Sequence, residues 1–346
     1  MLGPVVAGAD RVVRLTGRGG VPASGVRAVV VNATVTGVTE GMDLQVYPLG
    51  ERPARRTSNL NAAKGAVLAN LVTTAVGEDG SVGLSVSRGA SHVVLDVLGW
   101  YDDGSATSGA TGFTALTPDR RFDSRPGDPV TAGAARTVPL FTNVPAGVTA
   151  AVVSVTALGS SGNADVALTA PGTQPSTRTS TLNLRRGDTV ANLAVVPVDA
   201  QGRAVVSVSQ GQVEVVLDVM GYYSPSSTGR FTPVGPNRTY DTRDNSTALP
   251  AGEERAVTVA GLGGVPSSGV SAVLVNVTST RATANADLQV YPSGARPTVR
   301  TSNLQIRRGR DLAVLVVAKV GAAGKVVLSS SAGATDIVFD VVGWMS

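Results

Sequence analysis

The chain has 346 residues, of which 42% are hydrophobic and 16% are charged, and its formal net charge is +4. The content of valine, alanine and leucine is high enough for a packed core, which argues against a disordered chain. The arginines are scattered along the sequence and form no basic stripe with aromatics, so we expect no nucleic acid partner. Cysteine is absent, which excludes disulfides and thiolate metal sites.

Other site classes are disfavoured in the same way. His92 is the only histidine, and no Asp-x-Asp-x-Asp-Gly calcium loop occurs, so we expect no metal and no cofactor. No apolar run reaches the ~18 residues of a membrane span. The first residues lack the basic start and apolar stretch of a secretion signal. For an exported protein we therefore expect a signal that has been removed or lies outside this sequence or, if Met1 is native, export by another route such as release inside an assembled particle.

In chain order, short β-branched segments alternate with turns rich in Gly, Pro and Asn, a pattern typical of antiparallel strands. Strands are predicted at 11–15, 29–35, 42–48, from 58 onward, at 71–76, 82–86 and 93–101. The predicted strands at 71–76 and 82–86 flank 77–80, whose Asp-Gly pair predicts a hairpin. The segment 57–69 is the single candidate for a helix.

The predicted strand at 93–101 recurs twice, at 215–223 and 337–345, and each copy carries one aspartate among apolar neighbours. Asp96, Asp218 and Asp340 are each 122 residues apart, a spacing the size of a whole domain. We therefore predict an all-β protein of three tandem antiparallel β-sandwich repeats of jelly-roll or Greek-key type. The predicted repeats cover 1–102, 113–224 and 230–346.

A further element precedes the second and third copies only. These motif segments, 113–125 and 231–243, follow Ser/Thr/Gly-rich linkers at 103–112 and 224–229. The first copy therefore looks incomplete at its N-terminal edge. Either each motif segment packs on the preceding unit and the third copy is uncovered, or a neighbouring subunit or an upstream segment fills the first copy by strand addition.

The repeated pattern Arg-x-x-Asp-Thr-Arg, Val-Asn-Val-Thr, Tyr-Pro, Ser-Asn-Leu and Asp-Val-x-Gly-Trp/Tyr resembles repeats of secreted and cell-surface proteins of actinobacteria. The second copy departs from it at Ser154 and Thr181 and lacks the Tyr-Pro pair. The resemblance implies an extracellular or cell-surface location and accessory units that accompany cell-wall hydrolases or stand as tandem arrays.

The acids and arginines of the repeat are interpreted as structural. Each closing aspartate is predicted to be buried and satisfied by backbone groups or an arginine, because an unpaired buried charge is too costly. Members of two Asp/Arg pairs in the motif segments lie two residues apart, so they share a strand face and are predicted to form ion pairs or clamps onto the next unit. These pairs are Asp123 with Arg125 and Asp241 with Arg243.

One constellation suggests ligand binding. Strand alternation in 42–48 places Leu44 and Val46 inward and an acid, an amide and an aromatic ring together on the outer face. Such a face can bond sugar hydroxyls and stack on a pyranose ring, although an ordinary half-solvated strand has the same pattern. The candidate glycan-binding residues are Asp43, Gln45, Tyr47, Asp287, Gln289 and Tyr291.

The sequence therefore predicts no enzyme, because a Ser-His-Asp triad would have to use His92, at a position that accepts any polar residue. The first hypothesis is a secreted cell-surface module for adhesion or anchoring that binds cell-wall or surface glycan. The alternative is a structural stalk, filament or particle subunit that assembles head-to-tail by protein contacts. Both hypotheses include self-association.

Overall fold

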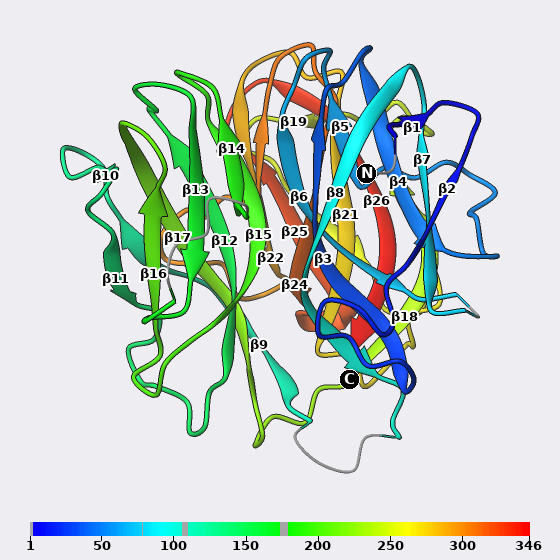
Figure 1. Ribbon diagram of the computed structural model, residues 1–346, viewed down its shortest axis with the longest axis horizontal. Helices are drawn as coiled ribbons and strands as arrows, with labels where there is room; N and C mark the ends of the chain where they lie inside the picture. The colour runs from blue at the N-terminus through cyan, green and yellow to red at the C-terminus, as the bar shows by residue number, and fades with distance from the viewer. Residues whose placement is uncertain (1–2, 78, 106–109, 174–178) are drawn as a thin grey trace.

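The computed structural model describes residues 3–77, 79–105, 110–173 and 179–346. The predicted hairpin at 77–80 and the linker at 103–112 lie partly outside these residues. Within them, all regular structure is β-strand except one 3₁₀ turn, η1 (Ala322–Gly324). No helix among the described residues has the length and apolar character needed to cross a membrane. The prediction of an all-β protein is confirmed (Figure 1).

The first unit consists of two packed sheets of four strands each. Its strands are β1 (Val5–Val6), β2 (Arg11–Arg14), β3 (Val26–Thr36), β4 (Met42–Pro48), β5 (Leu60–Ala62), β6 (Leu68–Ala75), β7 (Ser81–Val86) and β8 (Ala90–Asp102). One sheet has the order β1-β8-β3-β6 and the other β2-β7-β4-β5. The first strand therefore pairs with the last, and the second with the last but one, which is the jelly-roll topology.

The second unit repeats this topology with β10-β17-β12-β15 and β11-β16-β13-β14. Its strands are β9 (Gly112–Asp123), β10 (Val130–Thr131), β11 (Arg136–Pro139), β12 (Ala150–Leu158), β13 (Ala164–Thr169), β14 (Leu182–Leu184), β15 (Val190–Pro197), β16 (Arg203–Val208) and β17 (Gln212–Ser224). The strand β9 is an addition to the eight and pairs with β17.

The third unit has the sheets β19-β26-β21-β24 and β20-β25-β22-β23, with β18 added beside β26. Its strands are β18 (Phe231–Asp241), β19 (Leu249–Pro250), β20 (Glu254–Thr258), β21 (Ala272–Thr280), β22 (Ala286–Pro292), β23 (Leu304–Ile306), β24 (Leu312–Lys319), β25 (Lys325–Ser330) and β26 (Ala334–Met345). The predicted jelly-roll class is thus confirmed in all three repeats.

Each sandwich has its own apolar core between its two sheets. In β3, Val29 and Val31 point into the core of the first unit, whereas Ala28 and Val30 point to the opposite face of the sheet. That opposite face is also buried, against the other two units. Burial on both faces explains why β3 and its counterparts are nearly continuous apolar runs rather than alternating sequences.

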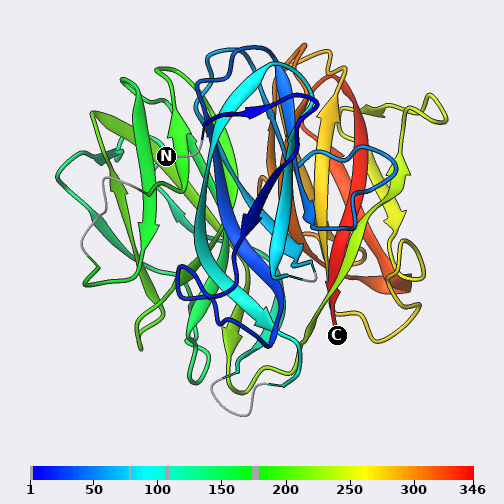
Figure 2. The ribbon, with the colours of Figure 1, turned by 45° about the vertical axis from the view of Figure 1, so that its right-hand side comes forward.

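The three units close into a ring around a common axis (Figures 1 and 2). The strands β6, β15 and β24 each contact the other two, while β14 lies against β6, β23 against β15 and β5 against β24. Contacts that repeat in cyclic order form a closed assembly, here within one chain. At the axis, the buried side chains of Leu71, Leu193 and Leu315 belong to one shared apolar cluster.

The three tandem repeats pack against one another, because the apolar outer faces of β3, β12 and β21 belong to one buried cluster. One expectation from the sequence is wrong. The segment 57–69 is not helical, since β5 occupies 60–62 and β6 begins at Leu68. Pairing of both strands in a sheet satisfies the backbone groups that a helix would otherwise have satisfied internally.

The motif segments lie in their own units. Strand β9 pairs antiparallel with β17, and β18 pairs antiparallel with β26. The alternative in which each segment packs on the preceding unit is therefore wrong. The uncovered copy is the first one, where β8 pairs with β3 on one side and with β1 only at residues 90–91 on the other.

Candidate functional site

The first arginine of each motif segment lies directly opposite a closing aspartate. Arg120 is the register partner of Asp218, and Arg238 is the register partner of Asp340. Antiparallel pairing at a strand edge therefore delivers a guanidinium to each buried carboxylate. The phenylalanine that begins each segment, Phe113 or Phe231, lies opposite the C-terminal end of the strand that carries the aspartate, β17 or β26.

Arg120 and Asp218 form a buried bidentate ion pair. The Arg120 Nε and Nη2 atoms donate to Asp218 Oδ1 and Oδ2 at 2.8 and 3.2 Å, and Asp218 is 1% exposed. Burial raises the pKa of Asp218, and the bonds from Arg120 act against that rise. The arginine makes up for the loss of hydration that the carboxylate suffers on burial.

The same ion pair joins the second unit to the third. Arg120 Nη2 also donates to the Arg300 carbonyl at 3.0 Å, and the Ser302 amide donates to Asp218 Oδ2 at 3.2 Å. In the third unit, Arg238 donates to both oxygens of Asp340 at 2.7 and 3.0 Å and to a carbonyl of the first unit at 3.3 Å. Each pair therefore closes a strand edge and a unit interface together.

The aromatic ends of the motif segments pack on glycines. A Cβ atom at Gly221 would lie 2.4 Å from Cζ of Phe113, and one at Gly343 would lie 2.3 Å from Cε2 of Phe231. The ring of Phe231 then packs on Tyr101 of the first unit, with 4.3 Å between ring centroids. These glycines are flat platforms on which a phenylalanine lies close to the strand backbone.

The first unit has none of these partners. We call residues 93–102 of β8 the open edge, because among the described residues no strand pairs with the side that β9 and β18 cover in the other units. The Asp96 carboxylate has no hydrogen bond or ion pair with any described residue, and burial raises its pKa. At Gly99 an added Cβ would meet nothing within 4 Å.

The side chains along the open edge are correspondingly exposed. Val94, Leu98 and Trp100 are 44%, 42% and 38% exposed. Their counterparts Val216 and Met220 in the second unit are fully buried. The open edge is therefore a mainly apolar strand whose outer backbone groups have no strand partner among the described residues and whose Asp96 carboxylate lies among apolar neighbours, a combination that native proteins seldom leave uncovered.

The far ends of the motif segments are held by local ion pairs. Arg125 donates through Nε to Asp123 at 2.8 Å, and Arg243 donates to Asp241 at 2.7 and 2.6 Å. Hydrogen bonds from these arginines lower the pKa of both aspartates. Arg55 of the first unit also donates to Asp241 at 3.1 Å, so this pair contributes to the contact between the third and first units.

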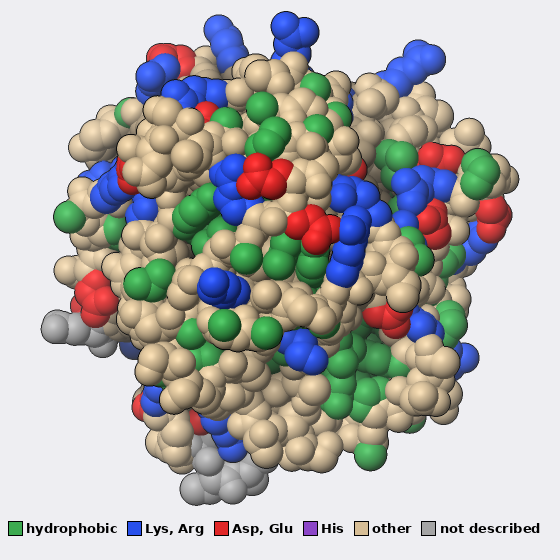
Figure 3. Space-filling model, turned by 180° about the vertical axis from the view of Figure 1, so that it is seen from behind, with side chains coloured by type: hydrophobic (Ala, Val, Ile, Leu, Met, Phe, Trp, Pro, Cys, Tyr) green, Lys and Arg blue, Asp and Glu red, His purple; other side chains and the backbone are tan. Residues whose placement is uncertain are grey.

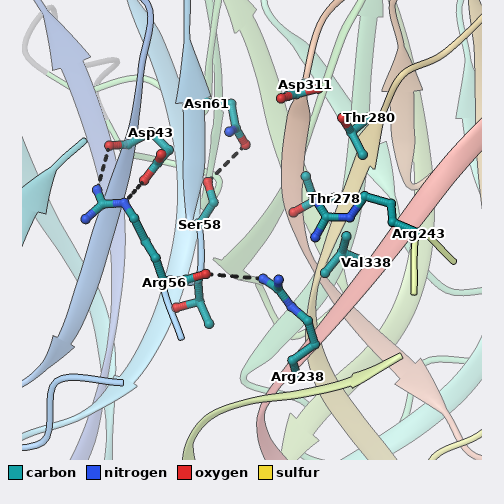
Figure 4. Close-up of a pocket in the computed structure, with 11 residues that line it drawn as sticks. Asp43, Arg56, Ser58, Asn61, Arg238, Arg243, Thr278, Thr280, Asp311 and Val338 are labelled. Atoms are coloured by element: carbon teal, nitrogen blue, oxygen red, sulfur yellow. Dashed lines mark hydrogen bonds and ion pairs between the residues drawn. The ribbon is translucent and has the colours of Figure 1, made fainter. Parts of the chain in front are cut away.

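A small pocket of about 170 Å³ lies at that contact (Figure 4). Arg56 donates to Asp43 at 2.6 Å across it, and Ser58 donates to the Asn61 amide oxygen at 2.9 Å. Arg238 donates to the Arg56 carbonyl from the opposite side. The bonds within the first unit fix its side of the pocket, and the bond from Arg238 joins the third unit to it.

A larger depression of about 860 Å³ lies on the common axis, lined by residues of all three units. Two of its arginines bind neighbouring units: Arg185 donates to the Gly65 carbonyl, and Arg307 donates to the Thr189 carbonyl at 3.1 Å. Among the described residues, no group of three or more His, Asp or Glu side chains is placed to hold a metal ion. The face in Figure 3 shows Lys/Arg and Asp/Glu side chains interspersed.

The predicted glycan-binding face is not a solvent-facing surface. Leu44 and Val46 point into the core, as the alternation predicts, but Gln45 and Tyr47 on the opposite face are only 1% and 5% exposed, so the prediction that this face is open to solvent is wrong. The cause is the loop before β5, which folds over this side of β4. Gln45 Nε2 donates to Thr57 Oγ1 at 3.1 Å, and Asn59 Oδ1 accepts from the backbone of β4 at 2.7 Å.

The equivalent residues of the third unit are covered in the same way. Gln289 and Tyr291 are 1% and 2% exposed, and Gln289 donates to Thr301 at 3.0 Å. Asp287 accepts from Arg300 at 2.7 Å, as Asp43 does from Arg56. The acids and amides of both copies are therefore bonded to the loop within the fold, whereas Tyr47 donates to Asp10 and the Tyr291 hydroxyl is buried without a hydrogen-bond partner among the described residues.

Sequence reasoning did not single out Arg120, Arg238, the two segment phenylalanines or the glycine platforms. The signal was available, because Phe and Arg are separated by seven positions in both segments, at 113 and 120 and at 231 and 238. What was missing is the register, which alone brings the arginine to an aspartate about 100 residues later in the chain.

No protein-family model and no curated protein sequence matches this chain. A search of solved structures finds a chain from the atomic structure of Sulfolobus turreted icosahedral virus, with 9% identity and a TM-score of 0.21, covering 99% of this chain and 84% of that one. A second match, from work on the triple jelly roll fold and turret assembly in an archaeal virus, has 10% identity, the same TM-score and the same coverage. A TM-score of 0.21 is too low to show a common fold, and neither match bears on function.

Proposed function

We propose that the protein is a non-catalytic structural subunit that acts through protein–protein contacts, with the open edge of the first unit as its docking surface. The observation that carries this proposal is the break in an otherwise repeated ring. Two units have a covered last strand with a paired aspartate, and the first unit has an exposed last strand with Asp96 unpaired among the described residues.

The remaining polar groups support the same function. The arginine and aspartate pairs join strands to strands and units to units, as in Arg120 with Asp218 and Arg55 with Asp241. The candidate glycan-binding residues are engaged within the fold. A rigid ring with one incomplete strand edge is well suited to joining a larger assembly, because an exposed edge recruits strands from other chains.

Sedimentation velocity over a range of protein concentrations tests this proposal. We expect the purified protein to self-associate reversibly when no other chain covers the open edge. The change Leu98→Glu places a charge on that edge and should shift the protein toward monomer. Leu262, which is 42% exposed as Leu98 is, lies in the third unit and provides the matched control Leu262→Glu.

Two results would contradict the proposal. One is a wild-type protein that remains monomeric at all concentrations and binds specifically on a glycan array. The other is equal loss of association in both leucine variants, which would place the contact away from the open edge. Negative-stain electron microscopy of the same samples shows whether the associated species are ordered.

A further inference from the structure

The open edge lacks three partners that the motif segments supply in the other units: a phenylalanine ring at Gly99, an arginine at Asp96 and a strand that pairs with the backbone. In the third unit, β18 places Phe231 opposite Met345 and Arg238 opposite Asp340. The residues of β8 that lie 244 positions before Met345 and Asp340 are Tyr101 and Asp96. A strand that bound β8 in this register would place its aromatic ring near Gly99 and its arginine at Asp96.

Each of these positions has the chemistry of an occupied counterpart. The space above Gly99 is empty out to 4 Å, where Gly221 and Gly343 have phenylalanine rings. No arginine among the described residues pairs with the Asp96 carboxylate, whereas Asp218 and Asp340 each have a bidentate arginine partner. The backbone groups of the open edge face the side on which β9 and β18 form their ladders in the other units.

We propose that the open edge binds an extended segment of a partner polypeptide with the pattern Phe-x₆-Arg-x₂-Asp-x-Arg, which adds to the sheet as a strand antiparallel to β8. This inference rests on the proposed function and names its partner chemistry. The phenylalanine covers Gly99, the first arginine forms a bidentate pair with Asp96, and the new strand covers Leu98. Main-chain bonds supply affinity in strand addition, and the two side chains set the register.

The motif segments of a second copy of this protein do not supply the bound segment. Both motif segments of a copy are already paired with their own units. If a copy donated β9 to its neighbour, it would expose an identical edge at its own β17, so the number of covered edges would not change. Pairing of two β8 strands would leave Gly99 uncovered and bring Asp96 no arginine.

The probe is a synthetic peptide with the sequence of residues 229–243. The chain has two tryptophans, Trp100 on the open edge and Trp344, so Trp344→Phe leaves Trp100 as the only reporter. We expect binding at a ratio of one peptide per protein with a blue shift of Trp100 emission as the edge is covered. No emission change and no heat of binding at about millimolar peptide would overturn the proposal.

Matched variants test the register. The peptide changes R238Q and F231A, and the protein change Asp96→Asn, should each weaken binding about tenfold or more. Leu98→Glu should abolish binding, and Leu262→Glu should leave it unchanged. Melting curves of the protein variants confirm that each is folded. Equal affinity of the Asp96→Asn variant and the wild type would overturn the assignment of the arginine subsite.

The same peptide separates this inference from the proposed function. If the protein self-associates through the open edge, the peptide should dissociate the oligomers, and the R238Q peptide should do so less effectively. Self-association without any binding of the peptide would overturn the inference and leave the structural function in place. Self-association that persists although the peptide is bound would place the protein contact away from the open edge and count against the proposed function. A monomeric protein that binds the peptide in the predicted register supports the inference and counts against self-association.

Discussion

Arg120 donates from Nε and Nη2 to the two carboxylate oxygens of Asp218, 98 positions later in the chain, at 2.8 and 3.2 Å. This pair is 15% and 1% exposed at its two side chains. It fixes the register of β9 on β17 and, through the Arg300 carbonyl, the contact between the second and third units. The counterpart of Asp218 in the first unit, Asp96, lacks such a partner among the described residues.

This difference predicts opposite results for one substitution at equivalent positions. Asp218→Ala removes the bidentate partner of the largely buried Arg120 and leaves it only the more exposed Asp123, at 3.2 Å, so it should lower the free energy of unfolding by about 3 kcal/mol. Asp96→Ala removes a half-buried carboxylate that is unpaired among the described residues. It should change the free energy of unfolding by less than about 0.5 kcal/mol. Urea unfolding of the two variants measures both values. Equal losses at the two positions would contradict the assignment of Asp96 to an open edge.

The glycine platforms give a second matched comparison. Gly221→Ala forces a methyl group into the ring of Phe113, at 2.4 Å, and should destabilise the protein by about 1–3 kcal/mol. Gly99→Ala adds the same methyl group to open space, so we expect no loss of stability. Differential scanning calorimetry compares the two. A melting temperature lowered equally by both changes would show that Gly99 is already covered.

The shared apolar cluster at the axis couples the three units. Leu193→Ala in the second unit leaves a cavity at the axis and should cost about 2–5 kcal/mol of stability. Because the cluster contains residues of all units, the unfolding transition reported by Trp100 and Trp344, in the first and third units, should shift with it. The exposed Val144 in the same unit provides the control Val144→Ala. Tryptophan emission that unfolds at the wild-type urea concentration would contradict a common core.

The acid stability of the ring should depend on Asp241. Hydrogen bonds from Arg243 lower its pKa below the ordinary value of 3.8, so it contributes stability above that value and loses the contribution as the pH falls through the folded pKa. Asp241→Asn should therefore cost about 1–3 kcal/mol at pH 7 and progressively less below about pH 3.8.

Unfolding in urea at neutral and acid pH measures this dependence. Asp119, an exposed acid in β9, provides the control Asp119→Asn, for which we expect a change below about 0.5 kcal/mol. A difference between wild type and Asp241→Asn that is the same at pH 7 and at pH 3 would show that the loss is not electrostatic.

The amino-acid sequence by itself determined the strands and the repeat. The β-branched runs and the turn residues predict the strand succession, and Asp96, Asp218 and Asp340 set the 122-residue period. These are local features or exact recurrences, so they are visible without knowledge of contacts. The jelly-roll class follows from them because each repeat has enough short antiparallel strands for two packed sheets.

Only the tertiary structure decided how the repeats meet and which polar groups are free. Leu71 and its counterparts lie in strands that are largely buried on both faces, so nothing local distinguishes a residue at the ring axis from one in a sandwich core. Gln45 alternates as a surface residue does, yet a loop covers it. Arg120 meets Asp218 only through the register of β9 on β17. Each of these outcomes depends on contacts between distant segments, which strand periodicity does not encode.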